Sequence, residues 1–438
     1  MNTLRYTSLP VFLILALFAS CDQNPIFHNI SWQQPPVTPI IRGSPQNMVV
    51  TEQRLYAWTQ RGEFVWAFDS AGRWTSLATP PVSNFGGFGG LTAVGAPGNE
   101  ILFAIVYSGG GSFPVPHLVR HSGNQWIRAD VDLSAYAIGR LYSAGNNIFA
   151  RAQLRSSPTS YVILRFVPNL ANLDAPVEYE RLSIRGSTTG DLGNNLVGAL
   201  SHAGQIFIAT ARNGIFRVAP GIGGAVTPFT GASGFNVSGI FSTTNDLVIV
   251  GNTHNAGVIH VVRGVTAFTA AHTWESEPPT FNGTFFNGGM SVWRSLDLTY
   301  NNPSQLFNNW RPRLLLVGIR TNGRSHGYRE FILDENANIL NAAQARIPGG
   351  WDFSVENTFS TAENRSRYNS SIGTRSVRYI LQVPNLGGNF YPVMHADGSP
   401  WHERWQPPVF ASTSIDGLWA YNPREDWWNA EDGTVSWR

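Results

Sequence analysis

The chain has 438 residues with 30 basic and 28 acidic side chains, and its formal net charge of +2 gives no electrostatic basis for binding nucleic acid. Every basic residue is arginine, which excludes a lysine Schiff base and the lysine of a phosphate-binding loop. A single cysteine excludes an internal disulfide. Charged residues make up only 13 %, and with 44 glycines this composition indicates strands joined by tight turns.

The first segment has the pattern of a secretion signal. Arg5 provides a positive charge before an apolar run over residues 9–18, which is too short to cross a bilayer as a mature helix. Two small residues then lead directly to Cys21. We therefore interpret residues 1–20 as a signal peptide. Cys21 is either a functional part of that signal or an incidental cysteine after a plain secretory signal.

The position of Cys21 resembles the lipobox of bacterial lipoproteins, although Phe18 stands where that family usually has leucine. The resemblance implies that the chain is cut before Cys21 and that the thiol carries a fatty acid such as palmitate. It therefore implies a lipoprotein of the bacterial cell envelope whose membrane anchor is the lipid on Cys21. The membrane and the face on which it stands are left open.

Residues 21–45 are predicted to be the lipidated tether. They are rich in proline, glutamine and asparagine and lack sustained periodicity, which is typical of a linker that holds a folded body away from a membrane. The exception is Phe27–Trp32, which alternates enough to form a strand. Such a strand is a candidate to close a ring by pairing with the last repeat.

From residue 46 to residue 438 one pattern recurs about every 50 residues: a turn followed by a short apolar strand. A complete unit runs from a candidate inner strand at residues 47–50, through two further strands, to Trp74–Leu77. Similar units have inner strands at Leu196–Leu200 and Val237–Phe241. The recurring apolar strand contains, in chain order, Leu55, Ile101, Ile148, Ile206, Leu247, Leu314, Tyr379 and Leu418.

These units resemble the blades of β-propellers, and the phrases Gln205–Val218 and Asp416–Tyr421 look like blades of bacterial envelope and sensor propellers. The resemblance implies an all-β propeller over residues 46–438, with four-stranded antiparallel blades. The eight anchor strands predict eight blades, with seven as the alternative. A β-helix or a single large sandwich fits less well, because the spacing is variable and the same phrase returns.

The C-terminal tail is rich in tryptophan. One interpretation is packing at the closure of the ring, because tryptophan is mostly buried. The other is an exposed aromatic surface for a sugar or a partner protein. The candidate ligand-binding aromatics are Trp401, Trp405, Trp427 and Trp428.

The densest group of potential metal ligands is His395, Asp397 and His402. Imidazole and carboxylate groups suit zinc or another divalent ion, but their spacing is not that of a helical zinc motif. Neighbouring glycine and proline residues predict an ordinary polar surface loop. We therefore predict no metal and no cofactor, with these three residues as weak candidates.

No sequence motif identifies a catalytic residue. Residues 414–419 come near the Asp-box of sialidase-type propellers, but the glycine falls one place early. A nucleophile elbow is not visible. The absence of a signature favours a non-enzymatic protein, and catalytic residues remain unknown.

The leading functional hypothesis is therefore a lipid-anchored β-propeller that acts as a binding or scaffold module for an envelope protein, a peptide or a glycan. The alternative is an envelope carbohydrate-active enzyme, a glycoside hydrolase or a lyase, working in the central funnel. That reaction needs carboxylates contributed by different blades, and sequence spacing cannot show such a pair.

Overall fold

The computed structural model describes residues 45–262, apart from short gaps at 53, 60–64, 70–72, 110–113, 183–195, 213, 230–235, 243–246 and 254–255, and beyond them only strands β20–β32 and residue 417. The chain divides into two units, Met1–Thr38 and Pro39–Arg438, and every described residue belongs to the second. None of the described residues belongs to a helix with the length and apolarity needed to cross a membrane.

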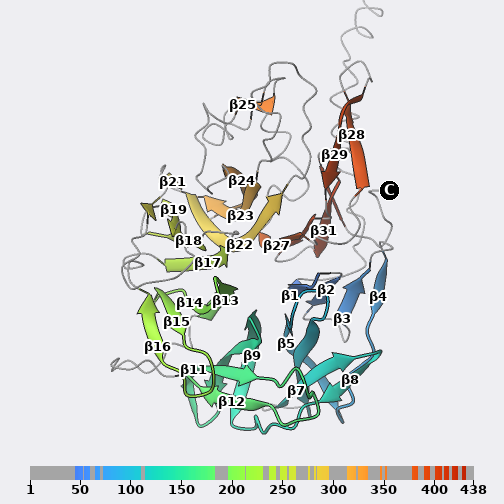
Figure 1. Cartoon of the computed structure of the whole chain (residues 1–438), viewed down its shortest axis with the longest axis vertical. Coiled ribbons are helices and arrows are strands. Elements are labelled where there is room, and N and C mark those ends of the chain that lie inside the picture. The colour runs from blue at the N-terminus through green and yellow to red at the C-terminus, as the bar shows by residue number, and fades with distance from the viewer. Residues whose placement is uncertain are drawn as a thin grey trace, which may run out of the picture. The chain divides into compact units, whose positions relative to one another are not determined.

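The described residues form antiparallel sheets that follow one another along the chain, and most sheets are built from strands that are neighbours in the sequence. The first three, coloured blue to green in Figure 1, contain β1 (Pro45–Val50), β2 (Leu55–Thr59), β3 (Val65–Phe68) and β4 (Trp74–Ser76); β5 (Phe85–Val94), β6 (Ile101–Ser108), β7 (Val115–Ser122) and β8 (Gln125–Arg128); and β9 (Tyr136–Ala144), β10 (Asn147–Leu154), β11 (Ser157–Val167) and β12 (Glu178–Arg181).

The next two sheets continue this arrangement. The fourth has β13 (Leu196–His202), β14 (Gln205–Thr210), β15 (Gly214–Val218) and β16 (Val226–Phe229). The fifth has β17 (Asn236–Ser242), β18 (Leu247–Asn252), β19 (Ala256–Val262) and β20 (Glu275–Ser276), and β21 (Phe281–Asn282) also pairs with β19. The inner strands β13 and β17 confirm the two predicted from the sequence.

The C-terminal sheets are less regular. Three strands form one sheet: β22 (Thr284–Arg294), β23 (Arg313–Thr321) and β24 (Arg324–Leu333). The last four-stranded sheet has the order β27 (Val377–Gln382), β30 (Val409–Thr413), β31 (Leu418–Asn422) and β32 (Trp427–Ala430). Two hairpins stand apart from these sheets: β25 (Arg346–Ile347) with β26 (Trp351–Asp352), and β28 (Asn389–Met394) with β29 (Pro400–Gln406).

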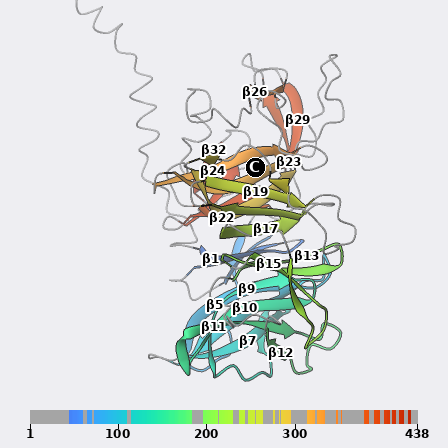
Figure 2. The same cartoon turned by 90° about the vertical axis from the view of Figure 1, so that its left-hand side faces the viewer.

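The innermost strands contact one another in sequence and close a ring. Strand β1 contacts β5, which contacts β9, and the series continues through β13, β17, β22 and β27 back to β1. Both views place β17 beside β22 (Figures 1 and 2). The second unit is therefore a β-propeller with four-stranded antiparallel blades, which confirms the predicted fold class.

The predicted number of blades is wrong for the part of the chain that the structure describes. Six sheets have four strands or more, rather than eight or seven, and the three-stranded β22–β24 sheet lies between the fifth blade and the last one. The excess of two has two sources: Tyr379 and Leu418 belong to one blade, as parts of β27 and β31, and Leu314 belongs to β23 of the three-stranded sheet. The β28–β29 hairpin separates Tyr379 from Leu418 in sequence and made them resemble two repeats.

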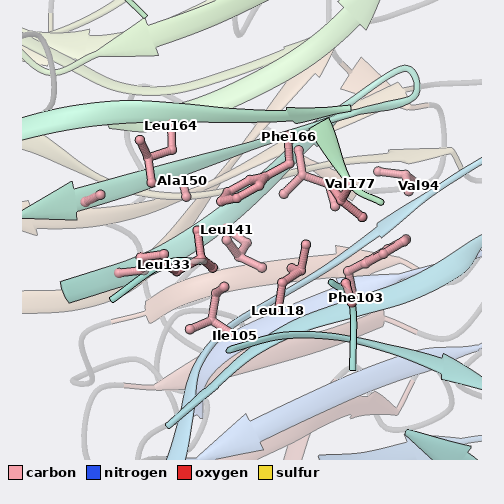
Figure 3. Close-up of a cluster of buried hydrophobic side chains, with 14 of the residues drawn as sticks. Val94, Phe103, Ile105, Leu118, Leu133, Leu141, Ala150, Leu164, Phe166 and Val177 are labelled. Atoms are coloured by element: carbon pink, nitrogen blue, oxygen red, sulfur yellow. The ribbon is translucent and has the colours of Figure 1, made fainter. Parts of the chain in front are cut away.

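Side chains of successive blades form the core between the sheets. Figure 3 shows the cluster in which Phe103, Ile105 and Leu118 of the β5–β8 blade face Leu141 and Phe166 of the β9–β12 blade. Alternate residues of a strand serve opposite sides. In β6, Phe103 and Ile105 belong to this cluster, whereas Leu102, Ala104 and Val106 belong to the cluster shared with the β1–β4 blade. Each of the first four blades buries both of its faces in clusters of this kind.

The ring closes through apolar packing between the first and last blades. Phe410 of β30 is fully buried, and its ring centroid lies 4.9 Å from that of Phe68 and 5.9 Å from that of Trp74. Leu55 and Leu418 join the same cluster. Among the described strands, the two blades exchange none, and this cluster and the contact between β1 and β27 connect them. The predicted closing strand, Phe27–Trp32, lies outside the described residues.

We expect Phe410→Ala to destabilise the protein by about 3–5 kcal/mol, because it leaves a cavity in an aromatic cluster at the ring closure. Guanidinium unfolding followed by tryptophan fluorescence measures this loss. Ile222→Ala is the matched control, since Ile222 is 44 % exposed and its truncation should change stability by less than about 0.5 kcal/mol. Equal losses in the two variants would contradict the importance of the closure cluster.

Candidate functional site

A cavity of about 590 Å³ lies where the β5–β8, β9–β12 and β13–β16 blades meet. This volume is within the range of small-molecule binding sites. The polar side chains that line the cavity are two arginines, three tyrosines and one glutamine, carried by β6, β9, β10 and β11. They are Arg140, Arg151, Tyr107, Tyr142, Tyr161 and Gln153.

A bulge in the inner strand β9 shapes one wall of the cavity. Leu141 pairs with Ala150 and Ile138 with Ala152, so Gly139 and Arg140 together stand opposite the single residue Arg151. An extra residue of this kind bends a strand and changes the direction of its side chains. The bulge therefore brings Arg140 and Arg151 to the cavity from neighbouring backbone positions.

The other inner strands also contain irregularities of this kind. Each shows a register shift against the second strand of its sheet. In β13 the extra residue is Val197, which also lines the cavity, and in β27 it is Arg378. Bulged inner strands therefore present residues toward the interior of the ring that a regular ladder would place differently.

Close packing of β5 against β9 supports the wall. A Cβ atom on Gly90 would lie 2.8 Å from the Gly139 carbonyl oxygen and 2.9 Å from the Leu141 nitrogen. Only glycine permits this approach, because the neighbouring atoms belong to the backbone. The hydroxyl of Tyr107 fixes the same junction by donating to the Ile138 carbonyl and accepting a 2.9 Å hydrogen bond from the Ile138 nitrogen.

Arg140 reaches across the interior of the ring. Its guanidinium carbon lies 5.8 Å from the ring centroid of Tyr379 in β27, although β9 and β27 are not neighbours in the ring. Burial acts to lower the pKa of Arg140, but the phenols of Tyr379 and Tyr142 raise it overall. Tyr379 packs against the closure cluster as well. The contact thus connects the cavity wall to the last blade through a cation–π interaction.

Arg151 is held at the wall by Tyr161, whose ring centroid lies 4.6 Å below the guanidinium carbon. Stacking uses the face of the guanidinium plane, while the N–H groups lie within that plane. Gln153, two residues further along β10, donates from its amide to the Pro158 carbonyl. These partly buried side chains are therefore held in place by contacts within their own blade.

The described lining has a positive character. It contains two arginines, and none of the described residues that line it is an aspartate or a glutamate. Burial raises the pKa of Tyr379 to about 12, although Arg140 and Arg378 act in the opposite direction. Burial also raises the pKa of Tyr107. These two phenols are therefore neutral hydrogen-bonding groups at physiological pH.

A serine–histidine pair occurs in the same blade, on β6 and β7. The distance between Ser108 Oγ and His117 Nε2 is 2.7 Å, and burial together with the charge of Arg128 lowers the pKa of His117. The imidazole is thus neutral near pH 7. Within the described part of the chain, no carboxylate bonds to His117 as the third member of a triad would.

The residues predicted from the sequence as site candidates lie elsewhere. Trp401 and Trp405 belong to β29 of the β28–β29 hairpin, whereas Trp427 and Trp428 belong to β32 of the last blade. Only their backbone is described. Cys21 lies outside the described residues. Trp419 of β31 is buried, but it lies outside the cluster at the ring closure, to which its neighbours Leu418 and Ala420 belong.

The weak metal candidates are not described as a group. His402 lies in β29, with only its backbone described, while His395 and Asp397 lie outside the described residues. In the segments that the structure covers, no three His, Cys, Asp or Glu side chains lie close enough together to hold a metal ion.

Comparison with known proteins leaves the family open. No protein-family model matches the sequence, and no curated protein matches it significantly. Among solved structures, the chain is similar to a subtype N11 neuraminidase-like protein of A/flat-faced bat/Peru/033/2010 (H18N11), with 8 % identity, 68 % of this chain and 89 % of that chain covered, and a TM-score of 0.38.

A protein from Lactobacillus plantarum is similar at 11 % identity, with 68 % of this chain and 84 % of that chain covered and a TM-score of 0.38. A prolyl endopeptidase is similar at 9 % identity, with 84 % of this chain and 47 % of that chain covered and a TM-score of 0.37. Similarities this weak transfer no function. The fold assignment therefore follows from the strand pairings and the contacts of the inner strands.

The sequence interpretation missed the cavity residues. Arg140 and Arg151 stand in separate strands, and Tyr107 comes from another blade. One signal was present: Tyr136–Ala144 combines two tyrosines, a glycine and an arginine in an inner strand that its position predicts to be apolar. The convergence of five strands on one cavity has no counterpart in the linear sequence.

We expect Tyr379→Phe to reduce the loss of stability at alkaline pH. Since the pKa of Tyr379 is raised from 10.0 to about 12, the folded state retains a proton that the unfolded state releases, and wild-type stability falls as pH rises through this window. The variant should lose about 2 kcal/mol less than wild type between about pH 9 and pH 11.5. Denaturant unfolding across this range measures the difference. Parallel curves for the two proteins would contradict it.

Proposed function

We propose that the protein is a lipid-anchored binding module of the bacterial cell envelope, which holds a protein, peptide or glycan partner on its propeller while the lipid on Cys21 attaches it to a membrane. The supporting observation is the cavity at the bulged inner strands. Its described lining offers charge, hydrogen-bond donors and aromatic rings. These are groups that recognise a ligand.

The carbohydrate-active alternative finds less support. Glycoside hydrolysis generally needs two carboxyl groups across the scissile bond, and the described residues lining the cavity supply neither. The serine–histidine pair does not line the cavity. A lining whose described residues offer no pair of carboxyl groups fits recognition better than turnover, so binding is the function that we propose.

The anchoring part of the proposal predicts that cells fed radioactive palmitate label the wild-type protein through Cys21, whereas Cys21→Ser carries no label. Immunoprecipitation and autoradiography measure the incorporation, and a blot for total protein normalises it. Membrane fractionation should then move the variant from the membrane to the soluble envelope fraction. Equal labelling of both proteins would overturn the lipobox assignment.

The binding part predicts that crosslinking in intact membranes recovers a reproducible partner or bound glycan. Mass spectrometry and saccharide analysis of the purified adduct identify it. The control is the same experiment with Phe410→Ala, in which the closure cluster is damaged and the adduct should decrease. Recovery of the protein alone over a range of crosslinker lengths, together with no saccharide, would count against a binding role.

A further inference from the structure

We propose that the cavity between the β5–β8, β9–β12 and β13–β16 blades binds an acidic saccharide, whose carboxylate pairs with Arg140 and Arg151 and whose sugar ring lies among the tyrosines. The inference rests on the binding role proposed above and names its ligand. It is argued from charge, from the aromatic and hydrogen-bonding groups of the lining, and from their fixed placement.

The charge of the lining selects an anion. Arg140 and Arg151 approach the cavity from opposite sides of one bulge, and none of the described lining residues carries a negative charge. A guanidinium presents a planar fork of donors that matches the two oxygens of a carboxylate. Two such groups at neighbouring positions therefore favour a ligand with a carboxylate over a neutral one.

The remaining polar groups favour a hydroxylated ring over a simple acid. Tyr107, Tyr142 and Tyr161 provide aromatic surface and hydroxyl groups, and Gln153 provides an amide. Aromatic faces pack against apolar ring surfaces, while phenol and amide groups exchange hydrogen bonds with hydroxyls. A cavity of about 590 Å³ accommodates a ligand of the size of one or two sugar rings.

The placement of these groups is fixed before a ligand arrives. The ring of Tyr161 lies under the guanidinium of Arg151, and that of Tyr379 lies under the guanidinium of Arg140. The Tyr142 hydroxyl donates a 3.4 Å hydrogen bond to the Leu196 carbonyl oxygen of the next blade. Side chains that are already ordered lose less conformational freedom on binding. The lining is therefore suited to hold a rigid ring.

Calorimetric titration of the full chain with matched saccharides tests the proposal. The probes are digalacturonate beside neutral α-1,4-linked galactobiose, and cellobiouronic acid beside cellobiose; within each pair the linkage is the same and carboxylates replace hydroxymethyl groups. We expect at least one acidic probe to bind, its neutral counterpart to bind at least tenfold more weakly, and the affinity of the acidic probe to fall with added salt.

Substitutions in the lining should weaken the binding of the acidic probe. Arg140→Gln and Arg151→Gln should each reduce affinity by about 10- to 100-fold, the range for a charged hydrogen-bond partner. Arg73→Gln is the matched control, because Arg73 lies outside the cavity and its side chain is 73 % exposed. The two arginines lie on different strands, so a variant that fails to fold leaves the other as the test.

Three results would overturn the inference: equal binding within each pair, no binding of either acidic probe, or binding of a short peptide with a free C-terminal carboxylate in place of the saccharides. If the crosslinked partner persists and Arg140→Gln leaves it unchanged, only the saccharide site is wrong. If chromatography shows that the protein cleaves a bound probe, the site stands and the proposed non-enzymatic role is wrong.

Discussion

The structure depends on blades that are buried on both faces, as the first four blades are. Strand β10 illustrates this: Ile148, Ala150 and Ala152 pack toward the β5–β8 blade, while Phe149 packs toward the β13–β16 blade. A strand covered on both sides is apolar at successive positions, which is why the second strand of each unit is the clearest sequence signal. With a single cysteine in the whole chain, apolar burial replaces the internal disulfides that stabilise many secreted domains.

The same constraint explains where chemistry-bearing residues gather. An inner strand has a hydrogen-bonded neighbour on one side only, so its other edge faces the interior of the ring. Polar residues are tolerated there because water or opposing side chains satisfy them. The bulges add a residue at this edge and re-aim its side chain, as Arg140 of β9 illustrates. Without the bulges, the inner strands would present their side chains to the interior of the ring in fewer directions.

The contrast between fully packed second strands and polar inner-strand edges explains which features the sequence predicted. Leu55, Ile148 and Leu247 lie in fully packed second strands, and their periodicity sufficed to predict the propeller. The blade count failed at Tyr379 and Leu418, because a hairpin inserted within one blade looks like the boundary between two. The cavity was missed for a different reason: its side chains belong to three blades, and a register shift of one residue leaves no periodic trace.

Ring closure and the candidate site are physically connected. Tyr379 packs against the cluster that contains Phe410, and the face of its ring lies under the guanidinium of Arg140. An aromatic ring held by core packing is a firm support for a cation, and the cation–π contact in turn restrains Arg140. Because Tyr379 packs against the closure cluster, its position depends on how well the first and last blades pack. The geometry of the cavity is therefore a property of the closed ring rather than of the three blades that line it.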